Sequence, residues 1–480
     1  MFKKFVKLAE KLVLFLLLIF AAYIVFYKLG NSYLENWDEA WYGDIIRNMM
    51  RRKEFVVLYW NKMVLIDKPP FFMWVGAVIS SLIGLSEFSI RLPSAVSAII
   101  IIACTTYYCY KNYGFIPSLL AFSSLAFNNI FIWRARTGNI DATVSLEIFL
   151  SYFLMLSKKK YKYLLLGILF AIIYLTKASL VFFPLGIFLL HELFFETRNL
   201  KKNFKKYILL FSVFILLSGT WLVLGSLKEG WRFAEYYLFR SDQGAADINF
   251  FNFNFNFNYI KYAYYSLQRR FFWVLLLGLI FLVSKIKESK NFLLFSFSVL
   301  LLVLVSLGNK DNNWYLVPSM PFWSITIAFG TFKFIKFFEK NAKIKLLATA
   351  IVIVLSFYVS YKTYTVNIRS VMASQTTTNL AKISSYLHGI SEEDDQVARL
   401  DHLYPTTIYY TDRFVYCSDQ SAGTDGFFLR REDLFKKISR GEIKWVTGKN
   451  TEIEQFLQKL PEGKGQVIAT EGDEQLVRLE

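Results

Sequence analysis

Two short polar segments near the N-terminus carry residues whose types and spacing favour chemistry. Residues 37–42 follow the first long apolar run and contain Asp38 and Glu39. About thirty residues later, Lys68 stands between Asp67 and two prolines, which fix the backbone and hold the lysine in an extended conformation. Acidic groups at a membrane face are costly and indicate a function. Together these residues predict a site that grips a phosphate carried by a lipid and activates a hydroxyl beside it.

Each of these residues also has a structural explanation. Asp38 begins residues 38–52, where apolar positions recur with helical spacing, and this predicts an amphipathic helix lying on a surface. Asp38 can cap such a helix, but capping does not account for Glu39 or for the tryptophans around the pair. Lys68 can extend from a membrane edge into water. The pairing of two acidic groups with a fixed ammonium group favours the site.

Two later segments place polar groups next to apolar runs. Arg134, Arg136 and Asp141 flank the start of one run, where a phosphate site that uses either arginine and a simple interface anchor are both open. Tyr315 follows a tryptophan and precedes Pro318. An aromatic pair at a membrane surface usually belongs to the aromatic belt, while the proline opens the first turn of a span and exposes carbonyl groups beside a cavity.

The composition indicates a protein that crosses a membrane several times. Of its 480 residues, 55% are hydrophobic and 19% aromatic, and the mean hydropathy is +0.36. A soluble protein is about 45–50% apolar. The net charge of +18 comes from lysines and arginines gathered in short gaps between apolar runs, which is the positive-inside pattern. No nucleic-acid motif accompanies this charge, so we expect no nucleic-acid partner.

The basic gaps also predict the orientation of each apolar run. They place the N-terminus in the cytosol and the polar tail outside, and the run at 71–86 then cannot cross. We read this run as an interfacial helix. About 11 spans remain, within a range of about 11–13. The candidate spans are 11–28, 92–110, 115–131, 140–157, 162–177, 178–196, 207–227, 271–284, 291–307, 315–332 and 346–362.

The chain is expected to contain two domains. Residues 1–365 form an all-α polytopic membrane domain, in which residues 29–90 are an external catalytic loop with juxtamembrane helices. Residues 366–480 form a small extracytoplasmic α/β domain. Within it we predict strands at 396–400, 407–416, 444–447 and 466–479, and helices at 431–440 and 451–460.

The external loop at 227–270 carries basic residues that topology does not require, and among them we select Arg240 as a candidate phosphate ligand. Within the loop, residues 251–258 alternate phenylalanine and asparagine. A strand would place all the phenylalanines on one face, against lipid tails or a prenyl chain. The simpler interpretation is low complexity in a permissive loop.

Taken together, the motifs resemble GT-C-class glycosyltransferases that use polyprenyl-phosphate sugars. This class includes the protein O-mannosyltransferase superfamily, and the layout is most similar to bacterial lipid A aminoarabinose transferases. The segments that carry the resemblance are 38–42, Asn61 with 67–70, 91–94, Arg136 with Asp141, and 315–318. The lipid A enzymes differ in having an arginine where this chain has Trp41, and loop 227–270 contains no histidine.

The resemblance implies a role for each matched residue. Asp38 is the catalytic acidic residue, with Glu39 beside it, and Lys68 holds the phosphate of the carrier lipid. Asp67 stands where the lipid A enzymes have a glutamate linked to a metal, so a divalent metal is the one candidate cofactor. The substrate-binding residues are Tyr42, Lys68, Arg136, Asp141, Arg240 and Tyr315.

These residues predict an inverting glycosyl transfer on the outer face of the cell inner membrane. The donor is a polyprenyl-phosphate-linked sugar, because no nucleotide-binding motif is present and an outward-facing site lacks nucleotide sugars. The acceptor is a hydroxyl or phosphate of lipid A or another envelope glycoconjugate. Two alternatives stay open: a protein O-mannosyltransferase, and a flippase or transporter of lipid-linked sugars. Transporters usually show internal repeats, which this chain lacks.

Overall fold

The computed structural model describes residues 2–240, 255–308, 310–373, 378–418, 426–461 and 463–479. The chain divides into two compact units. Unit 1 consists of Met1–Leu29, Ile66–Val75 and Arg91–Ser374, and unit 2 consists of Gly30–Leu65, Gly76–Ile90 and Gln375–Glu480. The segment at 29–90, which we expected to form an external loop, is therefore shared between the units, and most of it, including Asp38, belongs with the C-terminal residues.

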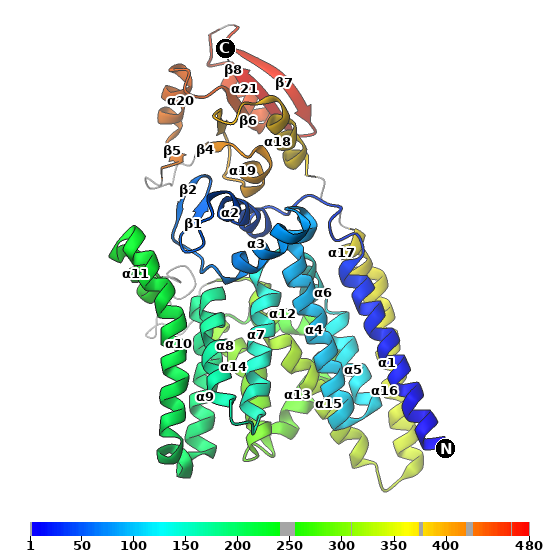
Figure 1. The fold of residues 1–480 in the computed structure, drawn as a ribbon. Helices are drawn as coiled ribbons and strands as arrows, with labels where there is room; N and C mark the ends of the chain where they lie inside the picture. The colour runs from blue at the N-terminus through cyan, green and yellow to red at the C-terminus, as the bar shows by residue number, and fades with distance from the viewer. Residues whose placement is uncertain are drawn as a thin grey trace. The chain divides into compact units, whose positions relative to one another are not determined.

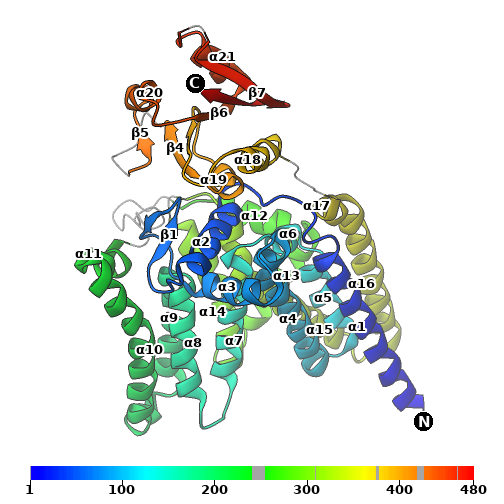
Figure 2. The ribbon, with the colours of Figure 1, turned by 45° about the horizontal axis from the view of Figure 1, so that its top comes forward.

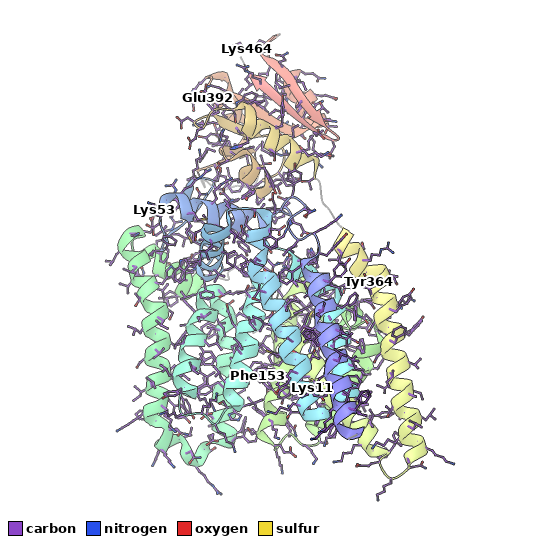
Figure 3. All side chains as sticks on the ribbon, turned by 45° about the vertical axis from the view of Figure 1, so that its right-hand side comes forward. Lys11, Lys53, Phe153, Tyr364, Glu392 and Lys464 are labelled. Carbon is purple, nitrogen blue, oxygen red and sulfur yellow. The ribbon has the colours of Figure 1, made fainter. Side chains whose placement is uncertain are left out.

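Unit 1 is a bundle of long apolar helices (Figure 1). In Figure 3, Lys11 and Phe153 lie toward one end of this bundle and Tyr364 toward the other. Its elements are α1 (Phe2–Phe26), most of α4 (Glu87–Tyr113), α5 (Phe115–Ala126), α6 (Asn129–Arg136), α7 (Ile140–Leu156), α8 (Lys162–Thr176), η1 (Ala178–Val181), α9 (Phe182–Phe195), η2 (Thr197–Asn199), α10 (Leu200–Glu229), α11 (Trp231–Glu235), η3 (Tyr236–Arg240), α12 (Asn258–Ser266), α13 (Arg270–Val283), α14 (Ser289–Ser306), η4 (Asn313–Ser319), α15 (Met320–Phe337), α16 (Ala342–Thr363), η5 (Tyr364–Ile368) and α17 (Arg369–Ala373).

Among the described residues, six helices are long and apolar enough to cross a membrane. Two bent pairs, α5 with α6 at 59° and α12 with α13 at 108°, raise the number to eight. The other expected spans coincide with α7, α8 and α15. Helix α3 (Phe71–Ile83) has 13 residues, fewer than the roughly 20 that a span needs, but α8 is also short, with 15 residues. The interpretation of α3 as an interfacial helix stays a prediction.

Small residues allow the helices of unit 1 to pack closely. Gly278 on α13 faces α15, where a Cβ added at position 278 would collide with the backbone oxygen of Thr326. Gly330 lies against Gly278 in the same interface. Because lipid tails are as apolar as leucine, close van der Waals packing of this kind holds membrane helices together.

We therefore expect Gly278→Ala to destabilise the protein by about 1–3 kcal/mol, because the new methyl group overpacks the contact between α13 and α15. Thermal unfolding in detergent measures the effect. Gly186→Ala on α9 is the matched control, since a Cβ there meets open space. Equal melting temperatures for the two variants would contradict the packing argument.

In unit 2, a hairpin follows helix α2 (Asp38–Arg52). Strands β1 (Leu58–Trp60) and β2 (Met63–Leu65) pair in antiparallel register. The two residues between them, Asn61 and Lys62, have φ values of 51° and 62°. Positive φ at both central positions is the geometry of a type I′ turn, which matches the twist of a two-residue hairpin.

The C-terminal part of unit 2 is an α/β fold, as expected. Its described residues form a six-stranded sheet in the order β5-β4-β3-β6-β8-β7, in which β3, β4, β5 and β6 run parallel. The elements are α18 (Asn379–Ile390), β3 (Gln396–Arg399), α19 (Pro405–Thr411), β4 (Phe414–Ser418), β5 (Phe428–Leu429), α20 (Arg431–Ser439), β6 (Trp445–Lys449), α21 (Asn450–Leu457), β7 (Gly465–Glu471) and β8 (Glu474–Leu479).

Two expected strands of this domain are wrong in their extent. Residues 407–416 were expected to form one strand, but α19 ends at Thr411 and β4 begins at Phe414. Pro405 begins this helix at a position where a proline is favourable, and the β-branched and aromatic residues that suggested a strand instead face the core. Residues 466–479 form the hairpin of β7 and β8 rather than one strand.

Helix α2 packs against α19 within unit 2, and α19 lies between α2 and the sheet (Figure 2). The helix spans residues 38–52 as predicted, but part of its polar face is buried. Asp44, Arg47 and Asn48 are all buried. Arg47 forms an ion pair with Asp44 and lies 3.2 Å from Asp412 at the end of α19. The amphipathic pattern predicted the helix correctly but did not reveal that a second polar surface covers it.

Candidate active site

The two acidic residues of the first motif differ in their surroundings. Asp38 is the first residue of α2 and is partly exposed, whereas Glu39 is only 2% exposed. The Glu39 Oε2 atom accepts a hydrogen bond from the backbone N–H of Glu35 at 2.6 Å. The N-cap position belongs to Trp37 and not to Asp38. Glu39 thus shapes the turn before the helix, and Asp38 is the more accessible carboxylate.

Tyr42 and Trp41 form an aromatic cluster with Trp60 in unit 2. The ring of Trp41 stacks on Tyr42 at 5.9 Å and also contacts Trp60 on β1. Tyr42 is 2% exposed. Its ring is therefore part of the packed interior of unit 2. A role for Tyr42 in substrate binding stays a prediction.

The second motif lies in unit 1, where Asp67 and Lys68 are held by tyrosines from η3. The Lys68 Nζ atom is 3.3 Å from the Asp67 Oδ2 atom. The Tyr236 hydroxyl donates to Asp67 Oδ1 at 2.7 Å, and the Tyr237 hydroxyl donates to the backbone oxygen of Lys68 at 3.0 Å. Both side chains of the ion pair are about one-third exposed. The ammonium group is therefore oriented and accessible, as a phosphate ligand must be.

Burial raises the pKa of the Tyr237 hydroxyl well above its usual value, and the nearby charge of Asp67 raises it further. The hydroxyl therefore stays protonated and keeps donating to the backbone of Lys68. The contacts of Asp67 do not fit a metal ligand. One oxygen accepts from Tyr236, the other faces Lys68, and no group of three or more His, Cys, Asp or Glu residues is found in the parts of the chain that are described.

Asp141 forms its ion pair with Arg134 and not with the expected Arg136. The Arg134 Nε and terminal nitrogen atoms lie 2.6 and 2.5 Å from the Asp141 Oδ2 atom. The Arg134 guanidinium also lies over the rings of Trp133 and Trp314, at 5.1 and 5.2 Å. A planar cation suits this position between two indoles.

Arg136 has a different set of partners. Its guanidinium donates to the backbone oxygens of Ile24, Val25 and Tyr27, at the end of α1. Arg91 donates to Leu29 in the same region. These carbonyl groups lack partners within the helix. Arg136 is therefore engaged in holding the end of α1, and Arg134 replaces it as the arginine paired with Asp141.

Tyr315 lies on the 3-10 helix η4, and the Lys177 ammonium group is 4.6 Å from the centre of its ring. Lys177 stands between α8 and η1, so the chain places a cation beside a predicted site residue. In the sequence analysis Lys177 marks only the boundary between the expected spans 162–177 and 178–196, and no functional role was predicted for it. Neither spacing nor periodicity linked Lys177, Tyr236 or Tyr237 to the motif residues.

Two predictions concern residues that lie wholly or partly outside the described part of the structure. Arg240 is the last residue of η3, but its side chain lies outside the described residues. Half of the alternating segment at 251–258 lies outside them as well, since the description resumes at residue 255. Both stay predictions.

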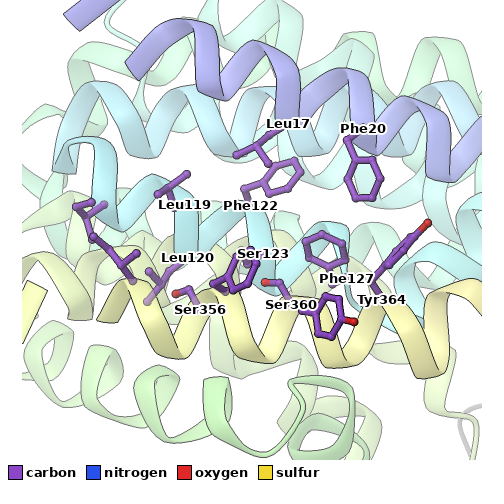
Figure 4. A pocket seen from close by; sticks show the side chains of 14 residues that line it. Leu17, Phe20, Leu119, Leu120, Phe122, Ser123, Phe127, Ser356, Ser360 and Tyr364 are labelled. Atoms are coloured by element: carbon purple, nitrogen blue, oxygen red, sulfur yellow. The ribbon is translucent and has the colours of Figure 1, made fainter. Parts of the chain in front are cut away.

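Unit 1 also contains an apolar cavity of about 340 Å³ between α1, α5 and α16 (Figure 4). Its lining suits a hydrocarbon chain better than a sugar or a phosphate. None of the predicted site residues lines it. The lining residues are Leu17, Phe20, Ile116, Leu119, Leu120, Phe122, Ser123, Phe127, Ile353, Ser356, Phe357, Ser360, Tyr361 and Tyr364.

The sequence was compared with known families and proteins. Residues 67–222 match the family model described as dolichyl-phosphate-mannose-protein mannosyltransferase. Two uncharacterized proteins of Aquifex aeolicus (strain VF5) are similar to the chain. One is 27% identical over 229 residues, covering 46% of both chains. The other is 29% identical over 338 residues, covering 67% of this chain and 74% of its own.

The fold was compared with solved structures. The crystal structure of ArnT from Cupriavidus metallidurans bound to undecaprenyl phosphate matches with a TM-score of 0.78 and 14% identity, over 97% of both chains. The chain has the GT-C glycosyltransferase fold. The oligosaccharyltransferase of Archaeoglobus fulgidus matches with a TM-score of 0.59 and 11% identity, over 90% of this chain and 68% of its own.

These matches confirm the resemblance to the GT-C class, the helical membrane domain and the small C-terminal α/β part. They support a membrane glycosyltransferase. At 14% identity the ArnT match establishes the fold alone. The family match begins at Asp67, so it includes Lys68, Asp141 and Lys177 but not Asp38.

The ion pair of Arg134 gives a prediction about stability. We expect Arg134→Ala to destabilise the protein by about 3–5 kcal/mol, because Asp141, at 3% exposed, is then buried without its countercharge. Thermal unfolding in detergent measures the loss, and Arg232→Ala, at an exposed arginine of α11, is the control. The double variant Arg134→Ala/Asp141→Ala should lose less than the two single variants combined; strict additivity would argue against the pair.

Proposed function

We propose that this protein transfers a sugar from a polyprenyl-phosphate carrier to an acceptor hydroxyl or phosphate on the outer face of a cell membrane. The observation that carries the proposal is the match, over nearly the full length of both chains, to ArnT bound to undecaprenyl phosphate. The accessible ion pair of Asp67 and Lys68 supports it, since it supplies an oriented cation for the phosphate. Lipid A or another envelope glycoconjugate is the proposed acceptor.

In the proposed reaction, Lys68 binds the phosphate of the carrier lipid. As the bond between sugar and phosphate breaks, negative charge develops on the departing phosphate, and a fixed ammonium group stabilises it. Tyr236 and Tyr237 keep the pair of Asp67 and Lys68 in place. Lys177 lies beside Tyr315, which is a predicted site residue. It is therefore a further candidate cation for the phosphate, although the sequence motifs do not include it.

Asp38 is the proposed general base. A carboxylate takes the proton of the acceptor hydroxyl while the oxygen attacks the anomeric carbon, which inverts the configuration of the sugar. Asp38 is the better candidate of the acidic pair, because Glu39 is buried and occupied by the backbone of Glu35. We assign Glu39 to positioning rather than to proton transfer.

Protein O-mannosylation is the second candidate function. The specific observation in its favour is the family model matched by residues 67–222, whose description names a protein mannosyltransferase. In that reaction the acceptor is a serine or threonine hydroxyl of a protein, and the donor is a polyprenyl-phosphate mannose. The roles of Asp38 and Lys68 are the same in both reactions, so the residues do not separate the two acceptors.

Transfer is tested with the purified full-length chain in proteoliposomes. The vesicles contain a panel of prenyl-phosphate sugars together with a lipid acceptor or an acceptor peptide, and mass spectrometry identifies the product. A glycosylated lipid supports the first proposal, and a glycosylated peptide supports the second. Movement of labelled carrier across the bilayer without a glycosylated product would overturn both in favour of a flippase.

We expect Asp38→Asn to lower kcat by roughly 100-fold or more, because the amide cannot take the proton of the acceptor. The initial rate of product formation at saturating donor measures this. Asp394→Asn, at an exposed carboxylate of unit 2, is the control and should keep full activity. An active Asp38→Asn enzyme would exclude Asp38 as the base.

We expect Lys68→Met to raise the KM for the donor by about tenfold or more, since a charge-assisted contact with the phosphate is lost. The same variant should lose affinity for the free polyprenyl phosphate, which a binding assay measures without any reaction. Lys287→Met, at an exposed lysine between α13 and α14, is the control. Unchanged binding of the lipid phosphate would show that Lys68 does not hold it.

A further inference from the structure

The segment that carries Asp38 is attached to helix α19 on the N-terminal side of the aspartate. The backbone N–H of Leu34 donates to the Tyr410 hydroxyl at 2.7 Å. Two residues further on, the Asn36 side-chain oxygen accepts from the Thr406 backbone N–H at 3.3 Å and from its hydroxyl at 3.1 Å. Residues 34–36, which precede Asp38, are therefore held by residues from both ends of the short helix α19.

The same helix holds α2 on the C-terminal side of Asp38. Two nitrogen atoms of Arg51 donate to the two oxygens of Asp412, at 2.8 and 2.6 Å. The Arg47 guanidinium lies over the ring of Tyr409 at 4.8 Å and donates to its backbone oxygen at 2.5 Å. Because the arginines stand one turn apart on α2, these contacts fix the rotation of the helix about its axis as well as its position.

A third contact joins the hairpin after α2 to the sheet. The Asn61 amide donates to the Val415 backbone oxygen at 2.8 Å, and its side-chain oxygen accepts from the Val415 N–H at 2.9 Å. A side chain thus pairs with strand β4 as the backbone of a neighbouring strand does. The ring of Trp60 packs edge-on against Phe427 beside this contact.

Asp412 is an unusual residue to find at this position. It follows the last turn of α19, where the helix dipole disfavours a carboxylate, and its φ of 54° is in the left-handed region. Burial acts to raise the pKa of Asp412, but the hydrogen bonds from Arg51 and the charge of Arg47 outweigh burial and lower it. Arg47 and Arg51 of α2 thus stabilise a negative charge on Asp412 that α19 by itself disfavours. The charge of Asp412 therefore favours the packing of α19 against α2.

We propose that α19 is a positioning element for the catalytic aspartate and that Asp412 is its principal positioning residue. The contacts of α19 lie on both sides of Asp38 in the sequence, from Leu34 to Arg51. Asp412 acts by fixing the place and the rotation of α2, whose first residue is Asp38. This inference rests on the proposed function, in which Asp38 is the base.

The test compares Asp412→Asn, Asp412→Glu and the matched control Asp433→Asn in the full-length protein. Asp433 is an exposed carboxylate on α20, paired with Lys436 of the same helix. Hydrogen–deuterium exchange is measured on the amides of residues 34–52 and on those of β3, β4 and β6. We expect exchange at 34–52 to rise about tenfold in Asp412→Asn as the segment opens locally, while the strands exchange as in the control.

Transfer kinetics provide the second measurement. We expect Asp412→Asn to lower kcat about tenfold or more, because a small displacement of a reacting group is costly, while the KM for the donor changes less than twofold. Asp412→Glu should recover most of the activity, because its carboxylate can still pair with the arginines. Equal exchange at 34–52 in the asparagine variant and the control would overturn the proposal, as would parallel opening of the sheet.

Unchanged kcat in an Asp412→Asn protein whose residues 34–52 exchange faster would also overturn the proposal. If the wild-type protein transfers no sugar from any donor in the panel, the proposed function fails by itself. In that case the exchange measurement alone decides whether α19 holds the acidic segment. Absence of sugar transfer thus contradicts the proposed function, whereas unchanged exchange at residues 34–52 contradicts the positioning role of α19.

Discussion

The pairing of Asp412 with Arg47 and Arg51 joins two parts of the chain that lie more than 350 residues apart in sequence. Within unit 2 it links α2 to α19, because it gives the arginines of α2 a partner on another helix. A buried or half-buried ion pair adds little net stability, since the cost of removing charges from water offsets their attraction. Its value is specificity, because the arginines have good partners in only one orientation of α2.

Unit 1 uses the same physical principle at the ends of its helices. A charge near the hydrocarbon region is tolerated when it is paired or bound to backbone carbonyls. Arg134 has a carboxylate and two indoles, and Arg136 has the free carbonyls at the end of α1. Lys68 differs from both arginines, because its partner Asp67 leaves it about one-third exposed. This greater exposure supports the proposal that Lys68 binds a phosphate.

Periodicity and composition predicted much of the fold. The limits of α2, the helical bundle and the α/β character of the tail followed from apolar spacing, since burial imposes that spacing directly. The partners of charged residues could not be predicted in the same way. Arg134 and Arg136 both stand on α6 a few residues before Asp141, so sequence spacing alone does not show which of them faces the aspartate. The prediction of one strand over 407–416 was wrong, because aromatic and β-branched side chains can be buried in a helix as well as in a strand.

The proposed base and the proposed phosphate ligand belong to different compact units, although only about thirty residues separate them. The chain enters unit 2 at Gly30, returns to unit 1 for Ile66–Val75 and leaves it again at Gly76. Asp38 therefore depends on packing within unit 2, above all on α19, while Lys68 depends on the tyrosines of η3 in unit 1. In the proposed reaction the general base acts on kcat. The phosphate ligand acts on the binding of the donor and also on kcat, because negative charge develops on the departing phosphate as the bond to the sugar breaks.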